Sequence, residues 1–298
     1  MAGLSAVPGP RRYAFGDGDL AARRLALLHE VYAPASSALL ADAVTSSPAL
    51  AYDLGCGPGY TTDMVARLTQ AKRTVGLDSS AHFVAAARAR HDEVRHQEAR
   101  HQEALAGANL EFEAHDVLAV PFPAGPAGLI YCRLLLAHLA DPAGAVRRWA
   151  SQLTDDGLVV VDEIEWIETS HPLLRAHLRL AELMVAASGA RMCAGPLLAT
   201  LSDARGSHSR GLRTHLTRIT EVPVPTAIAA QLFGMNLAVA GDRPVALGLC
   251  SASDLASLRS GLAELMVSAA TGSTATGEIT WGMRQAAYSP AEAGVFAT

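Results

Sequence analysis

Short apolar runs alternate along this chain with longer segments in which apolar residues recur every three or four positions. We interpret the apolar runs as strands, at residues 51–54, 74–78, 110–114, 128–132, 157–164, 213–222 and 278–288. Runs of this length bounded by turn residues are typical of buried strands. Strands that alternate with helices predict an α/β fold with a mostly parallel sheet.

Helical spacing fills the segments between these runs. Asp17 to Asp42 is predicted to form two helices, because Pro34 interrupts the pattern and has no amide hydrogen to donate. Further helices are predicted at 81–105, 134–139, 143–153, 173–188, 226–240 and 253–270. We divide the chain into an N-terminal tail and helical cap (1–48), a core (49–170) and the rest of the same domain (171–298).

A glycine-rich loop directly follows the first predicted strand. Gly55, Gly57 and Gly59 have no Cβ and can adopt positive φ, so a bulky ligand can lie against the backbone, with Asp53 nearby as an acceptor. A dinucleotide-binding loop would have its third glycine at position 60, where Tyr60 stands. A purely structural turn between strand and helix is the other alternative. We expect the loop to hold a cofactor that contains a nucleoside.

Two more acids follow the next strands in order. Asp78 ends the second strand roughly 20 residues beyond the loop, where an α/β nucleotide site places its ribose-binding carboxylate. Asp116 follows the third strand. The loop, which reads Asp-x-Gly-x-Gly-x-Gly over 53–59, and these two acids together resemble the motifs of class I S-adenosylmethionine-dependent methyltransferases. The detailed resemblance spans about residues 49–165.

The resemblance implies a Rossmann-like seven-stranded sheet with helices on both faces and an antiparallel last strand. It also implies an N-terminal helical cap, and a helical insertion between strands 5 and 6 that shapes the acceptor site. S-adenosyl-L-methionine is the implied cofactor. Its methionine end is expected at the glycine loop, its ribose at Asp78 and its adenine at Asp116. The expected cofactor residues are Asp53, Gly55, Cys56, Gly57, Gly59, Asp78, Ser79, Asp116, Val117 and Arg133.

One position departs from the superfamily pattern. Many members carry an acidic residue at the start of the fourth strand, where this chain has Ala127 and Gly128. The match is therefore to the superfamily rather than to a close relative.

Candidate acceptor residues cluster after the fifth strand, whose carboxyl end is where an open α/β sheet presents its ligands. Glu163 and Glu165 are predicted to hold a cationic or hydroxyl-bearing substrate or to act as a base, and His171 to orient it. The substrate pocket is predicted to include Tyr13, His138, Trp166 and Asn236. A solvated helix face or simple packing is the alternative for each of them.

Charge and cysteine content exclude several other classes. The net charge of −5 is spread along the chain and gives no field that would attract a phosphate backbone, so nucleic acid is not expected as a partner. The four cysteines stand far apart, as free thiols in a reducing compartment do. We find no apolar run of about 18 residues and no leader-like N-terminus, so a cytoplasmic protein without membrane contact is expected. A homodimer stays open.

A quasi-repeat of five residues occupies 90–104 and contains His91, His96 and His101. A period of five matches neither a helix face nor a strand, so successive imidazoles rotate away from each other. We interpret the repeat as a solvent-exposed extension and predict no metal.

These features together predict methyl transfer from S-adenosylmethionine to a small-molecule acceptor in specialised metabolism. Oxygen or nitrogen is a better acceptor here than carbon, which would need a stabilised enolate. A protein that binds S-adenosylmethionine without catalysis is one alternative. A nicotinamide-dependent oxidoreductase is another, and the glycine spacing disfavours it.

Overall fold

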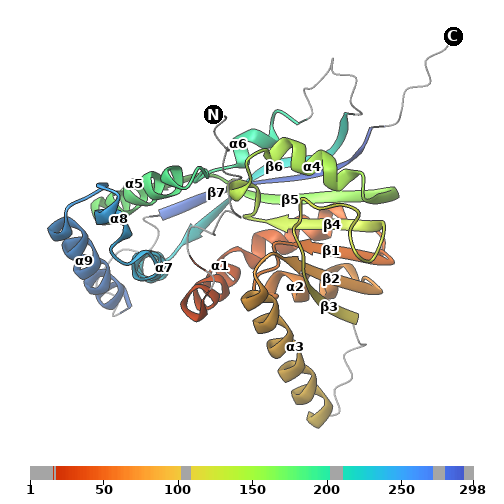
Figure 1. Ribbon diagram of the computed structural model, residues 1–298, viewed down its shortest axis with the longest axis horizontal. Helices are drawn as coiled ribbons and strands as arrows, with labels where there is room; N and C mark the ends of the chain where they lie inside the picture. Colours follow the sequence, from red (N-terminus) through yellow and green to blue (C-terminus); the bar gives the residue numbers. More distant parts are fainter. Residues whose placement is uncertain (1–15, 17, 102–108, 202–210, 271–278, 292–298) are drawn as a thin grey trace, which may run out of the picture.

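The computed structural model describes residues 16, 18–101, 109–201, 211–270 and 279–291. This part of the chain contains a seven-stranded sheet of order β3-β2-β1-β4-β5-β7-β6. The strands are β1 (Leu50–Leu54), β2 (Arg73–Asp78), β3 (Asn109–Ala114), β4 (Ala127–Arg133), β5 (Leu153–Thr169), β6 (Leu212–Val224) and β7 (Ile279–Pro290). The strands from β1 to β5 pair in parallel, whereas β7 runs antiparallel to both β5 and β6. The predicted Rossmann-like sheet, including its antiparallel last strand, is confirmed (Figure 1).

Helices cover both faces of the sheet. They are α1 (Asp19–Ala43), α2 (Tyr60–Thr69), α3 (Ala81–His101), the 3-10 helix η1 (Leu136–His138), α4 (Pro142–Ala150), α5 (Pro172–Ala187), α6 (Gly195–Leu198), α7 (Thr226–Ala240), α8 (Arg243–Ala246) and α9 (Ala252–Ala270). Strand residues alternate between the two faces. Ala51 and Val160 pack with α1 and α2, whereas Tyr52 and Val161 pack with α4 and α6.

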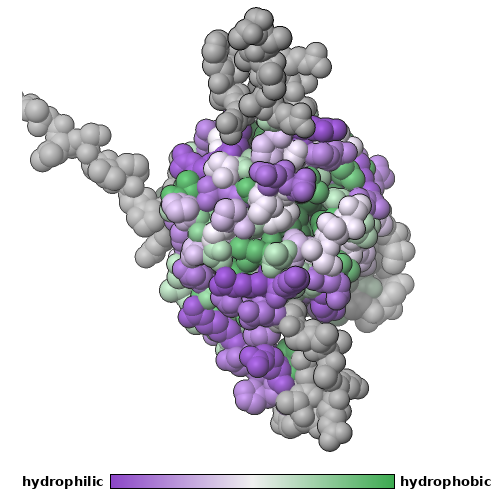
Figure 2. All heavy atoms as spheres, turned by 90° about the vertical axis from the view of Figure 1, so that its right-hand side faces the viewer, coloured by the Kyte–Doolittle hydropathy of each residue, from purple (hydrophilic) through white to green (hydrophobic). Residues whose placement is uncertain are grey.

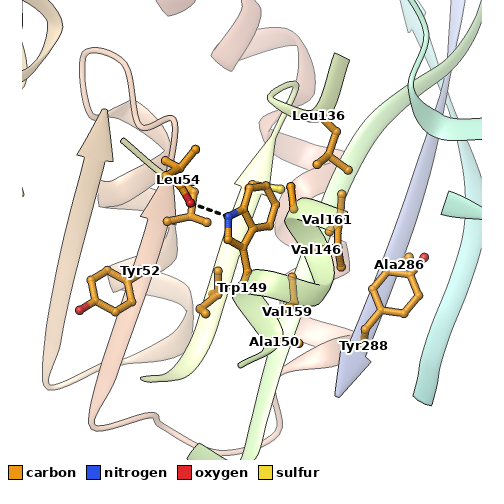
Figure 3. Close-up of a cluster of buried hydrophobic side chains, with 14 of the residues drawn as sticks. Tyr52, Leu54, Leu136, Val146, Trp149, Ala150, Val159, Val161, Ala286 and Tyr288 are labelled. Carbon is orange, nitrogen blue, oxygen red and sulfur yellow. Dashed lines mark hydrogen bonds between the residues drawn. The ribbon is translucent and has the colours of Figure 1, made fainter. Parts of the chain in front are cut away.

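Trp149 fills the centre of the face covered by α4. It is fully buried among Leu54, Val146 and Val161, as Figure 3 shows. Its Nε1–H donates to the carbonyl oxygen of Val117 at 2.8 Å, so the one polar atom of the ring is satisfied. This bond also ties the segment after β3 to α4.

The strands β5, β6 and β7 continue past the end of β4. The helices that pack on this extension are called the cap from here on, and they are distinct from the N-terminal helical cap predicted at 1–48. The pairing of β4 with β5 ends at Arg133 opposite Asp162, but β5 and β7 pair on to Thr169 opposite Ile279. Helices α5, α7 and α9 pack on this extension around Trp281 and Phe233. They gather at the left of Figure 1, beyond the sheet.

Helix α1 is continuous, so the predicted break at Pro34 is wrong. Proline removes one intrahelical hydrogen bond, but tertiary packing on both sides of it holds the helix together. Tyr32 and Ala35 are buried in the cap, and Leu39 and Leu40 are buried against the sheet.

The fifth strand is longer than its predicted range of 157–164. It extends to Thr169 because β7 supplies an antiparallel partner throughout. The register shifts between Ile164 and Trp166, which leaves Glu165 as a bulge residue. Glu165 and Trp166, which were expected to follow the strand as acceptor residues, therefore lie inside it. The predicted helix at 134–139 is also shorter, because only η1 forms there.

The outer part of α3 projects from the molecule. Residues 92–96 are exposed, and the hydrophilic projection at the bottom of Figure 2 is this helix. Exposure is thus confirmed for residues 92–96, whereas Arg90 and His91 at the start of the repeat are half-buried, with Arg90 paired to Asp63. Among the described residues, no three metal-ligating side chains come together, and none of the helices there has the length and apolar character to cross a bilayer.

Candidate functional site

The glycine loop after β1 has the backbone that its sequence predicts. Gly55, Gly57 and Gly59 all have positive φ, at 67°, 52° and 82°. A Cβ at Gly55 would come within 2.9 Å of the Leu135 side chain, and one at Gly57 within 3.3 Å of Leu25. Because these two glycines have no Cβ, α1 and the turn after β4 can pack directly over the loop.

Asp53 is buried at the end of β1 and holds the start of α2. Its Oδ2 accepts hydrogen bonds from the hydroxyls of Thr61 and Thr62, at 2.6 and 2.7 Å. Burial raises the pKa of Asp53 to about 6, and the two hydroxyls oppose that shift. The two threonines were not among the predicted site residues. The hydroxyl-rich run after the loop was the signal for them.

Asp78, at the end of β2, holds the loop from the other side. Its Oδ2 accepts from the Gly57 amide at 2.9 Å and its Oδ1 from the Ser80 amide at 2.8 Å. Ser79, predicted with it, is exposed beside it. A carboxylate fixed by two backbone amides next to the loop is oriented before any ligand arrives.

The remaining predicted cofactor residues of the core lie at the same edge of the sheet. Asp116 is exposed, and its Oδ1 accepts from the Leu118 amide at 2.9 Å. Val117 is buried, and so is Cys56 inside the glycine loop. Burial raises the pKa of the Cys56 thiol well above its usual value, so this sulfur is an apolar packing group and not a nucleophile.

Arg133 ends β4 and reaches α1. Its Nη1 donates to the Ser36 hydroxyl at 3.3 Å and its Nη2 to His29 Nδ1 at 3.1 Å. Burial, followed by the Arg133 charge, lowers the pKa of His29 to about 4, so this imidazole is neutral and can accept the bond. The ring of His29 also stacks on Tyr60, directly after the glycine loop. Sequence reasoning missed His29, since one histidine on a helix carries no distinctive pattern.

Glu163 shapes the turn that follows β4. Its Oε1 accepts from the amides of Leu135 and Leu136, at 2.7 and 2.6 Å. Leu134 has a φ of 56° in this turn, which is unusual for a residue other than glycine. Burial raises the pKa of Glu163 to about 8, so the carboxyl holds its proton at neutral pH.

The side chains of Glu165 and Trp166, on β5, both contact residues of β7. The Glu165 carboxylate accepts two hydrogen bonds from Arg284, each 2.5 Å long. A Cβ at Gly282 would lie 2.3 Å from the Trp166 ring, so the indole packs flat on β7. Neither side chain belongs to the glycine loop or to the turn held by Glu163.

His171 precedes α5, and Tyr13 lies outside the described residues. The Nδ1 atom of His171 is buried, and no described residue gives it a hydrogen-bond partner. Its backbone amide donates to the Thr169 hydroxyl at 3.1 Å.

A buried polar cluster connects α1, η1, α5 and α7. Arg24 is buried on α1, and its Nε donates to Oδ1 of Asn236 on α7. The charge of Arg24, after burial, lowers the pKa of His138 to about 4 and that of His177 to about 3. The structure thus joins the predicted His138 and Asn236. Sequence reasoning missed His177, which lies on the buried face of α5 and resembles an ordinary core position.

Comparisons with known proteins agree with this geometry. Residues 52–161 match the family model described as a methyltransferase domain. A trans-aconitate 2-methyltransferase of Methylobacterium nodulans is 35% identical over 159 residues, which cover 52% of this chain and 54% of that protein. Its counterpart from Methylobacterium radiotolerans is 33% identical over 152 residues, covering 51% and 49%. The chain thus spans about half the length of these relatives.

A solved structure shows the same fold over nearly the whole chain. The [4+2]-cyclase SpnF covers 97% of this chain and 100% of its own, with a TM-score of 0.52 and 18% identity. Fold, loop and family match together define a methyltransferase domain. Over residues 52–161 the chain is similar to S-adenosylmethionine-dependent methyltransferases of class I, as the glycine spacing predicts.

The described residues fit the cofactor of this class, S-adenosylmethionine. Packing alone favours glycine at positions 55 and 57, because a Cβ there would meet the side chains of Leu135 and Leu25. Beside the loop, Asp53, Asp78 and Arg133 offer acceptors for hydroxyls and a donor for a carboxylate. The donor set therefore matches the hydroxyl, amine and carboxylate groups of this cofactor.

Proposed function

We propose that this chain transfers the methyl group of S-adenosylmethionine to oxygen or nitrogen of a small molecule in specialised metabolism. The single observation that carries the proposal is the geometry of the glycine loop. Gly55, Gly57 and Gly59 all have positive φ, Asp78 accepts from the Gly57 amide, and Asp53 accepts from Thr61 at the start of α2. The match of residues 52–161 to the methyltransferase domain supports it.

Each cofactor residue receives a role from its position. Gly55 and Gly57 admit the methionine end, Asp78 accepts from the ribose hydroxyls, and Asp116 with Val117 borders the adenine. When bound, the cofactor supplies an electrophilic methyl group on a positively charged sulfur. The protein's task is to align the acceptor atom with that methyl in a dry site, which can be worth an effective molarity of about 10⁵ M or more.

The predicted catalytic residues differ in their contacts. We assign a structural role to Glu163, which accepts from the turn after β4, and to Glu165, which accepts from Arg284 on β7. His171 keeps an unpartnered Nδ1 and is the proposed residue for orienting the acceptor. For the acceptor itself, trans-aconitate is the first compound to test, because it appears in the names of two relatives.

Isothermal titration of S-adenosylmethionine into the Asp78→Ala variant tests the donor site. The affinity should fall at least about 100-fold, because both the ribose acceptor and the anchor of the Gly57 amide are lost. Asp155→Ala is the matched control, since Asp155 is an exposed acid near the start of β5. Its affinity should equal that of the unmodified chain, and far-UV circular dichroism should show both variants folded.

An unchanged affinity in Asp78→Ala would overturn the donor assignment. Methyl transfer is measured separately, with labelled S-adenosylmethionine and a set of small-molecule acceptors. Tight binding without product for any of them would favour a binding protein without catalysis.

A further inference from the structure

His177 is a buried imidazole that the methyl-donor site does not use. Only 1% of its surface is exposed, and neither ring nitrogen has a hydrogen-bond partner among the described residues. Its ring stacks on Phe233 at 4.0 Å with an angle of 12° between the planes. Stacking fixes the orientation of the ring, so its two nitrogens point in defined directions.

A neutral imidazole offers one hydrogen-bond donor and one acceptor. Buried polar groups nearly always have hydrogen-bond partners in native proteins. The two ring nitrogens of His177 therefore point to a bound molecule that supplies the missing partners. A ligand that enters beside α5 can supply both partners.

The surroundings of His177 are positively charged. Arg24 is buried and close enough to depress the proton affinity of both His138 and His177. Burial and the Arg24 charge are the causes that lower the pKa of His177. In a buried site, a positive field of this kind favours a negatively charged ligand.

Residues close to this cluster along the chain contact the methyl-donor loop. Leu25, next to Arg24 on α1, lies over Gly57, and Leu135, three residues before His138, lies over Gly55. The cluster therefore takes side chains from the same two segments, α1 and the turn after β4, that cover the loop.

We propose that the methyl acceptor is a carboxylic acid that binds between α5 and α7, with its carboxylate facing Arg24 and a hydrogen bond to His177. The inference rests on the proposed methyl-transfer function and names the substrate class of that site. Asn236 orients the Arg24 guanidinium, since its Oδ1 accepts from Nε. His177 supplies the donor and acceptor that select an acid with a further polar group.

Calorimetry on the protein loaded with S-adenosylhomocysteine tests this assignment. The probes are succinate, benzoate and trans-aconitate, each compared with its uncharged amide. At least one acid should bind at least about tenfold more tightly than its amide. The same acid should lose at least about tenfold in affinity in Arg24→Met and His177→Phe, while S-adenosylhomocysteine binds these variants as before.

Arg175→Met is the matched control, because Arg175 lies on the same helix as His177 but is exposed. It removes the same charge and should leave acid binding unchanged. If His177→Phe does not fold, the chain labelled with ¹⁵N-histidine replaces it. The ring nitrogens of His177 should then shift when the acid is added.

Acids that bind no better than their amides would overturn the proposal. So would unchanged affinity in His177→Phe, or unshifted ring nitrogens, which would make His177 a packing residue. Binding of S-adenosylhomocysteine to the unmodified chain is measured first, before any acid is added. If it does not bind, that result contradicts the proposed function and not the choice of acceptor.

Discussion

Glu163 illustrates how one buried side chain can fix the geometry of a turn. Its carboxyl receives two amides of the turn after β4 and is fully buried. The folded protein binds a proton there up to about pH 8, whereas an ordinary glutamate loses it near 4.5. Because the folded state binds more protons than the unfolded chain in this window, stability falls as the pH rises through it.

The Glu163→Gln variant should remove most of this pH dependence. The amide oxygen can still accept from Leu135 and Leu136, so the turn is kept. The free energy of unfolding, measured in urea at pH 5 and pH 8.5, should drop with pH by at least about 1 kcal/mol more in the unmodified chain than in the variant. Glu113→Gln, at an exposed position, is the control. Parallel curves for the unmodified chain and Glu163→Gln would contradict the shifted pKa.

Among the elements, β5 and β7 form the link between the sheet and the cap. The bulge at Glu165 breaks the alternation of β5 and turns that side chain toward Arg284 on β7. Both side chains are largely shielded, with 12% and 16% of their surfaces exposed. Two parallel hydrogen bonds in a shielded place make this pair stronger than a typical surface salt bridge.

A double-mutant cycle with Glu165→Gln and Arg284→Met should give a coupling energy of about 1–3 kcal/mol in urea unfolding. The matched control is the pair Arg73 and Glu111, which joins β2 to β3 with similar geometry but is about 40% exposed. Its coupling should stay below about 1 kcal/mol. Equal couplings in the two cycles would show that burial at the bulge adds nothing.

For the molecule as a whole, α1 connects the cap to the sheet. Leu28 and Tyr32 pack in the cap, and Leu39 and Leu40 pack on the sheet, within one continuous helix. An element shared by two apolar clusters makes them unfold together.

We therefore expect a single cooperative unfolding transition. Trp149 reports on the sheet and Trp281 on the cap, so variants in which Trp166 and one of these two are replaced by phenylalanine report on one cluster each. In each variant, the fluorescence midpoint should coincide with the midpoint from far-UV circular dichroism. A cap signal that melts first would make residues 171–298 a separate folding unit.

Local chemistry explains why the donor half of the site could be predicted. Positive φ at Gly55, Gly57 and Gly59 is a property of the residues themselves, and acids at strand ends meet at one edge of a parallel sheet whatever else surrounds them. The sequence by itself therefore determined the sheet, the loop and the class of cofactor.

The proposed acceptor half depended on the tertiary structure. Arg24 and Asn236 are 212 positions apart and meet only because α7 folds back over α1. The length of β5 and the continuity of α1 through Pro34 were likewise decided by partners distant in sequence, β7 and the cap. Contacts between distant segments leave no periodic signal along the chain, so the burial and charge around His177 became visible only once the chain was folded.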